Sequence, residues 1–200
     1  MKKLIIVPLM ILSMGVFAQK FQFGLKAGAN ISNFTGLKWE NVDTKARVGF
    51  HGGAFLNFLL GDNFMISPEV LFSSQGAKLE SAGHSENFDV SYLAIPVMLR
   101  YRFTGGFYLE AGPQFSFKLN ENVPDQSVEN FAKSSDVGIG MGLGYHGNGG
   151  LGIGARYIAG ISKVGDFDET QLANPDFKNG VIQVSLFYTL FNNHRDDNKH

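Results

Sequence analysis

The sequence predicts an all-β fold, an eight-stranded antiparallel up-and-down transmembrane β-barrel. Three observations predict it. After residue 20, segments that alternate apolar with small or polar side chains recur eight times. The connections between these segments alternate between long polar stretches and very short ones, which is typical of outer-membrane barrels. Glycine and phenylalanine are abundant, with 25 and 19 among 200 residues, and this pair disfavours helices while favouring strands and bilayer-facing surface.

We expect strands over residues 21–33, 48–60, 64–74 and 90–103 in the first half of the barrel. Each places its larger apolar side chains at every second position, as a strand with two different faces requires. In order along the chain, the apolar faces are Phe21, Phe23, Leu25, Ala27, Ala29 and Ile31; Val48, Phe50, Ala54, Leu56 and Phe58; Phe64, Ile66, Val70 and Phe72; and Leu93, Ile95, Val97, Leu99 and Tyr101. The opposite faces carry Gln22, Lys26 and Asn30; His51 and Asn57; Ser67, Glu69 and Ser73; and Tyr92, Ala94 and Arg100.

The second half repeats the pattern over residues 107–119, 137–145, 150–161 and 180–191. Its apolar faces are Phe107, Leu109, Ala111, Phe115 and Phe117; Val137, Ile139, Met141, Leu143 and Tyr145; Leu151, Ile153, Ala155 and Tyr157; and Ile182, Val184, Leu186, Tyr188 and Leu190. The opposite faces carry Tyr108, Glu110, Gln114 and Lys118; four glycines; Arg156 between glycines; and Gln183, Ser185 and Thr189. Pro96 lacks a ladder donor, so we expect a bulge at its position.

The connections carry independent information. Residues 61–63, 104–106 and 146–149 are rich in glycine and asparagine and predict tight hairpin turns. Residues 34–47, 75–89, 120–135 and 162–178 predict four long loops. Short turns on the periplasmic side and long loops outside would place both termini at the short-turn end.

A soluble barrel is the alternative, because alternation alone does not say which face meets water. A soluble barrel would carry many charges on its polar face, whereas here that face is mostly Gly, Ser, Asn and Gln. We therefore expect a lipid-facing apolar wall with aromatic residues near the strand ends, and a lumen filled by side chains. The glycines of the sixth and seventh strands would make room for Phe55, Tyr92 and Tyr108.

The ends predict export. Lys2 and Lys3 precede an apolar stretch, and Val16 and Ala18 suit a cleavage site, so we expect residues 1–18 to be a signal peptide. The barrel would then cover residues 19–191, followed by a polar tail over 192–200. Removing the charges of Lys2 and Lys3 changes the formal net charge from −1 to −3, which does not suggest a nucleic-acid partner.

Four segments resemble a known family. They are residues 24–30 (GLKAGAN), 67–76 (SPEVLFSSQG), 92–101 (YLAIPVMLRY) and 108–113 (YLEAGP). From residue 24 onward the chain resembles the outer-membrane β-barrel group of Bacteroidetes-type bacteria that includes PorT-like proteins. Ala94 departs from the family, which often has an acidic residue there. The resemblance implies fold and location; PorT-like members are linked to a secretion machinery, and no motif ties this chain to that role.

Five charged residues are the candidate site. Glu69, Arg100 and Glu110 fall on the polar faces of consecutive strands, so Arg100 would lie between two carboxylates in a confined lumen. Buried charges must be paired to persist there, and Lys26 and Arg156 could extend the network, as could His51. An internal salt-bridge network is the first interpretation; a gate or ligand site is the alternative.

No catalytic, cofactor-binding or metal site is expected. The five histidines, His51, His84, His146, His194 and His200, show no Ser-His-carboxylate or metal-ligand spacing. We therefore expect a non-enzymatic barrel in the bacterial outer membrane with a structural or interaction role. Its partners would be outer-membrane lipid and, through the extracellular loops at 37–47 and 164–178, a protein. A narrow channel for small solutes or ions is the second hypothesis, and a lipid-modifying enzyme is the third.

Overall fold

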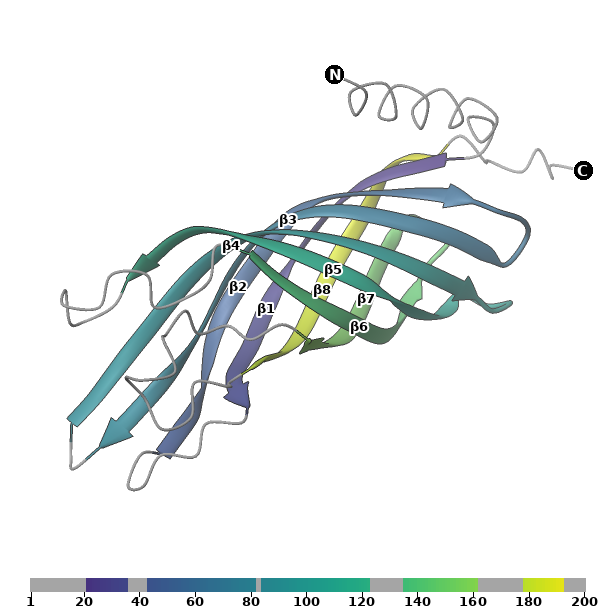
Figure 1. The fold of residues 1–200 in the computed structure, drawn as a ribbon. Helices are drawn as coiled ribbons and strands as arrows, with labels where there is room; N and C mark the ends of the chain where they lie inside the picture. The colour runs from purple at the N-terminus through teal and green to yellow at the C-terminus, as the bar shows by residue number, and fades with distance from the viewer. Residues whose placement is uncertain (1–20, 36–42, 82–83, 123–134, 162–177, 193–200) are drawn as a thin grey trace, which may run out of the picture.

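The computed structural model describes residues 21–35, 43–81, 84–122, 135–161 and 178–192. The expected signal peptide and most of the expected tail lie outside these residues. Eight strands run through the described chain (Figure 1): β1 Phe21–Thr35, β2 Asp43–Leu59, β3 Phe64–Ser81, β4 His84–Arg102, β5 Phe107–Asn122, β6 Ser135–His146, β7 Leu151–Gly160 and β8 Lys178–Asn192. None of the described residues forms a helix that could cross a bilayer.

The strands form one closed sheet. Each strand pairs antiparallel with the next along the chain, and β8 pairs antiparallel with β1. Figure 1 shows the purple start of β1 lying beside the yellow end of β8. Closure leaves every strand with a partner on both sides, which is the condition for a sheet in lipid. The predicted fold class, an eight-stranded up-and-down barrel, is confirmed.

The three short turns also confirm the prediction. Each is closed by a backbone hydrogen bond across the hairpin, from Leu60 N to Phe64 O, Phe103 N to Phe107 O and Gly147 N to Leu151 O, at 2.7–2.9 Å. Gly105 and Gly106 have φ values of 98° and 96°, which only glycine adopts without strain. These turns, Phe21 and Asn192 all lie at the same end of the barrel, called here the short-turn end.

The prediction of a long loop over residues 75–89 is wrong. β3 continues to Ser81 and β4 starts at His84, with the backbone paired to the last residues, Ser81 and His84. β2 likewise starts at Asp43, inside the expected loop 34–47. The alternation fades in these stretches because strands that leave the bilayer no longer need an apolar face. Backbone pairing does not depend on that face and continues.

The apolar faces point outward. Large side chains on the outer wall keep much of their surface exposed, for example Phe107 at 64% and Met141 at 63%, whereas the lumen residues Glu69 and Asn57 are at 0%. At the short-turn end, rings of the outer wall pack in pairs, Phe64 with Tyr101, Phe107 with Tyr145 and Phe21 with Phe191. An apolar wall bordered by aromatic rings is the surface that a bilayer solvates.

Two local expectations need correction. The register is continuous through Pro96, which pairs with Gln114, and the irregularity of β4 lies between Ser91 and Tyr92 instead. Among the three predicted lumen rings, Tyr108 does fill the space left by Gly144 and Gly154 of β6 and β7, but Phe55 packs over Gly24 of β1. The reason is the register, because Phe55 lies directly opposite Gly24.

Candidate functional site in the barrel lumen

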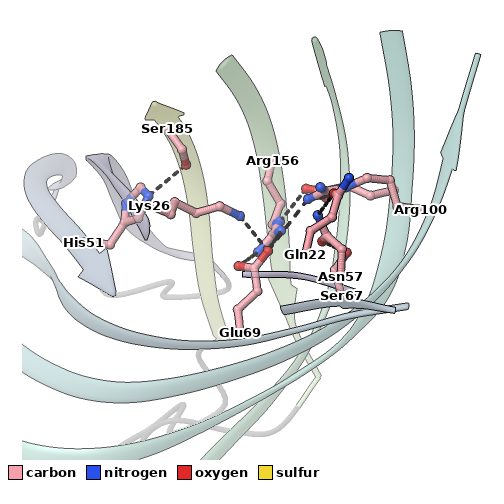
Figure 2. A network of polar contacts seen from close by, with 10 residues as sticks. Gln22, Lys26, His51, Asn57, Ser67, Glu69, Arg100, Arg156 and Ser185 are labelled. Carbon is pink, nitrogen blue, oxygen red and sulfur yellow. Dashed lines mark hydrogen bonds and ion pairs between the residues drawn. The ribbon is translucent and has the colours of Figure 1, made fainter. Parts of the chain in front are cut away.

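Five side chains meet in the lumen and are called the charge cluster: Lys26, Glu69, Arg100, Glu110 and Arg156. Figure 2 labels four of them, Lys26, Glu69, Arg100 and Arg156. Glu69 accepts hydrogen bonds from Lys26 Nζ at 2.5 Å and from Arg156 at 2.8 and 3.0 Å. Glu110 accepts from Arg156 Nε at 2.8 Å and from Arg100 Nη2 at 2.8 Å. The structure thus brings together all five residues of the expected lumen network.

The strand order explains how these residues reach one another. Arg100 and Glu110 are direct neighbours across β4 and β5. Glu110 and Arg156 are separated by β6, where Gly142 lies level with both. A Cβ at Gly142 would lie 3.0 Å from Glu110 Oε1, so a larger residue there would obstruct the ion pair. Glycine at position 142 lets β5 and β7 connect through the lumen.

The charge cluster carries more positive than negative charge. Three cations face two carboxylates, and each of the five residues is at most 6% exposed. Arg100 Nη1 is buried without a hydrogen-bond partner among the described residues. The guanidinium of Arg100 lies 4.3 Å from the centre of the Tyr108 ring, and Lys26 Nζ lies 6.0 Å from Phe55 and Phe187. Aromatic faces therefore stabilise the excess positive charge.

Phe55, Tyr108 and Phe187 form an aromatic layer on the short-turn side of the charge cluster. Phe187 packs edge-on against Phe55 and Tyr108, with ring centres 5.7 and 6.2 Å apart. Gly152 leaves the space that the Phe187 ring occupies. Alternation alone does not assign Phe187 to the lumen, although Phe187 falls on the polar-face positions of its strand. Its large apolar side chain breaks that alternation, and this exception was the available signal.

His51, which could have extended the network, bonds to other side chains instead. Its Nδ1 lies 2.7 Å from Asn30 Oδ1 and its Nε2 lies 2.8 Å from Ser185 Oγ. The Asn30 amide nitrogen donates to the carbonyls of Phe50 and Ser74, which leaves its oxygen facing His51. His51 therefore donates through Nδ1 and accepts the Ser185 hydroxyl proton through Nε2.

A serine, a histidine and an amide in this order resemble the arrangement of a nucleophile, a base and an orienting group. A nucleophile also needs space for a substrate and donors for the oxyanion. Asn30, His51 and Ser185 are 0%, 2% and 8% exposed. Two cavities open at the short-turn end, and a shallow groove lies on the outer wall. Asn30, His51 and Ser185 line none of these three spaces. We interpret this arrangement as structural: it forms a polar layer on the long-loop side of the charge cluster.

The remaining expected residues are placed as follows. His146 ends β6 and its Nε2 lies 3.0 Å from Thr189 Oγ1. His194 and His200, the side chain of His84 and most of the two expected recognition loops lie outside the described residues. Within the described part of the chain, no group of three or more His, Cys, Asp or Glu residues could hold a metal ion.

Three solved structures of outer-membrane or surface proteins are similar to this chain. Ail, the attachment invasion locus protein of Yersinia pestis, is 15% identical, with a TM-score of 0.50, over 86% of this chain and 99% of Ail. Neisserial surface protein A is 13% identical, with a TM-score of 0.49, over 83% and 96% of the two chains. OprG from Pseudomonas aeruginosa is 12% identical, with a TM-score of 0.46, over 85% and 93%. Of these three, only Ail reaches a TM-score of 0.50, and at 15% identity it shows the fold alone.

The sequence itself gives the family. No curated protein matches the chain significantly. Residues 17–166, more than half of the 200, match the family described as "Outer membrane protein beta-barrel domain". This match agrees with the closed barrel, the lipid-facing apolar wall and the paired aromatic rings. The chain therefore belongs to the outer membrane protein beta-barrel domain family of Gram-negative bacteria.

Proposed function

We propose that this protein is a non-enzymatic outer-membrane barrel with a sealed lumen, whose extracellular side has a structural or interaction role. The observation that carries the proposal is the filling of the lumen by two successive layers, the charge cluster and the aromatic layer. The resemblance to PorT-like barrels supports a place in that subgroup, which is part of the proposal.

The charge cluster blocks the lumen because its ion pairs connect strands from different sides of the barrel. Arg156 of β7 binds Glu69 of β3 and Glu110 of β5, and Lys26 of β1 also binds Glu69. Breaking a buried ion pair costs about 3–5 kcal/mol. An ion passing through would have to displace several such pairs and then pass the aromatic layer, so steady conduction is disfavoured.

The extended hairpin of β3 and β4 supports the interaction role. An outer-membrane barrel has an apolar band of about 25 Å, which a tilted strand crosses in about ten residues. β3 has 18 residues and β4 has 19, so both continue well beyond that band at the long-loop end. A paired hairpin outside the membrane is a rigid support from which a partner can be bound.

Single-channel recording in planar bilayers tests the proposal. The wild-type barrel should show no steady conductance, whereas a Tyr108→Ala and Phe187→Ala double variant, which empties much of the aromatic layer, should conduct more readily. Leu143→Ala, on the lipid-facing wall, is the control for loss of an apolar side chain. Steady, reproducible current steps from the wild-type barrel would refute the sealed lumen and favour the channel hypothesis.

A further inference from the structure

A cavity of about 530 Å³ opens at the short-turn end of the lumen. Its inner lining includes Met65 and His146, both 3% exposed. The His146 ring packs against Phe187 of the aromatic layer, with ring centres 5.2 Å apart. His146 therefore lies between the cavity and Phe187 of the aromatic layer, and the cavity volume is within the range of small-molecule sites.

The lining residue His146 carries a buried polar atom without a partner. His146 Nε2 lies beside Thr189 Oγ1, and His146 Nδ1 has no hydrogen-bond partner among the described residues. A buried polar atom left without a hydrogen bond is unfavourable.

Two opposite charges line the same cavity without pairing. Arg102 donates through Nη2 to the His146 carbonyl at 2.8 Å and to Asn148 Oδ1 at 3.3 Å, and these bonds fix the guanidinium at the rim. Its Nε and Nη1 have no partner among the described residues. The Asp62 carboxylate, also in the lining, forms no ion pair with Arg102 or with any other described residue. Both groups can still bind a ligand of opposite charge.

We propose that this cavity binds a small zwitterion, a free amino acid or a dipeptide with an unblocked ammonium and an unblocked carboxylate. The carboxylate binds Arg102, because a guanidinium matches a carboxylate in charge and geometry. The ammonium binds Asp62, and the His146 ring lies in the lining beside the bound molecule. This site is separate from the charge cluster and does not depend on the function proposed above.

Nuclear magnetic resonance titration of the full-length protein in detergent micelles tests the proposal. The signals of the histidine rings are followed while alanyl-alanine is added; His146→Gln identifies the His146 signal. Two probes are compared with it, acetyl-alanyl-alanine, which lacks the ammonium, and alanyl-alanine amide, which lacks the carboxylate. Alanyl-alanine should shift the His146 signal saturably, and each blocked probe should bind about tenfold more weakly, the effect of one lost charge-assisted hydrogen bond.

Two variants test the binding of the ligand carboxylate and of the ligand ammonium separately. Arg102→Gln should weaken alanyl-alanine and acetyl-alanyl-alanine about tenfold. Asp62→Asn should weaken alanyl-alanine by a similar factor and leave acetyl-alanyl-alanine unchanged. Arg47→Gln, at the opposite mouth, is the charge-matched control, and mobility on unheated gels shows that each variant is folded. No saturable shift, equal binding of all three probes, or unchanged affinity in folded Arg102→Gln would overturn the proposal.

Discussion

The excess of cations over carboxylates in the charge cluster makes removal of a carboxylate more costly than removal of a cation. Glu69→Gln leaves three cations facing only Glu110, whereas Lys26→Met leaves two cations facing two carboxylates. Both changes nearly preserve side-chain volume. We expect Glu69→Gln to lower the free energy of unfolding strongly and Lys26→Met to lower it only slightly.

The hydrogen bonds of Glu69 and Lys26 indicate how much the two variants should differ in their free energy of unfolding. Glu69 accepts one hydrogen bond from Lys26 and two from Arg156, and the amide of glutamine would place a donor against these donors. Loss of one partner from a buried ion pair costs about 3–5 kcal/mol. In Lys26→Met the bidentate bond from Arg156 to Glu69 remains, and methionine fills the space beside Phe55 and Phe187, so we expect a cost of about 1 kcal/mol.

The measurement is urea unfolding of the refolded barrel, followed by the different gel mobilities of the folded and unfolded chains. The free energy of unfolding comes from linear extrapolation, provided that unfolding and refolding curves coincide. The double variant Lys26→Met with Glu69→Gln should be more stable than Glu69→Gln alone, by about 1–2 kcal/mol, because it restores the wild-type excess of one positive charge. Asp136→Asn removes a lumen carboxylate outside the charge cluster and serves as the control.

Equal losses of stability in Lys26→Met and Glu69→Gln would contradict the predicted effect of the excess positive charge. A loss of less than about 1 kcal/mol in Glu69→Gln, well below the range for a broken buried pair, would contradict it equally. Either result would mean that water in the lumen compensates the charges, and the sealed lumen would then lose its main support.

Two further predictions concern glycine and serine. Gly144→Ala should lower the free energy of unfolding by about 1–3 kcal/mol, because its Cβ would overlap the Tyr108 ring. The control is Gly52→Ala, whose Cβ would meet only the Lys26 carbonyl at 3.8 Å and which should not change the free energy of unfolding in the same urea assay. Equal losses of stability in the two variants would contradict the predicted overlap with Tyr108. Ser185 should not react with a fluorophosphonate, because it is buried beside His51 without substrate space; labelling of Ser185 that disappears in His51→Gln would refute the non-enzymatic interpretation.

Most of the charged lumen residues could be predicted, because a charged side chain on a transmembrane strand avoids lipid and therefore faces the lumen. Glu69, Arg100 and Glu110 occupy the same face as Ser, Gly and Asn residues, so alternation alone assigned them to the lumen. The separation of His51 from the charge cluster could not be predicted. It depends on Asn30 and Ser185, which approach His51 from the neighbouring strand β1 and from β8 beyond it, and only the closed register aligns these residues.

The sequence by itself determined the barrel, the number of strands, the lipid-facing wall and the short turns. Each of these follows from local alternation or from turn residues that need no knowledge of distant contacts. The tertiary structure alone decided the depth at which lumen side chains meet, the aromatic layer around Phe187, the continuation of β3 and β4 beyond the bilayer and the cavity beside His146. These features depend on the stagger between strands, which is set when β8 closes on β1 and which no single segment encodes.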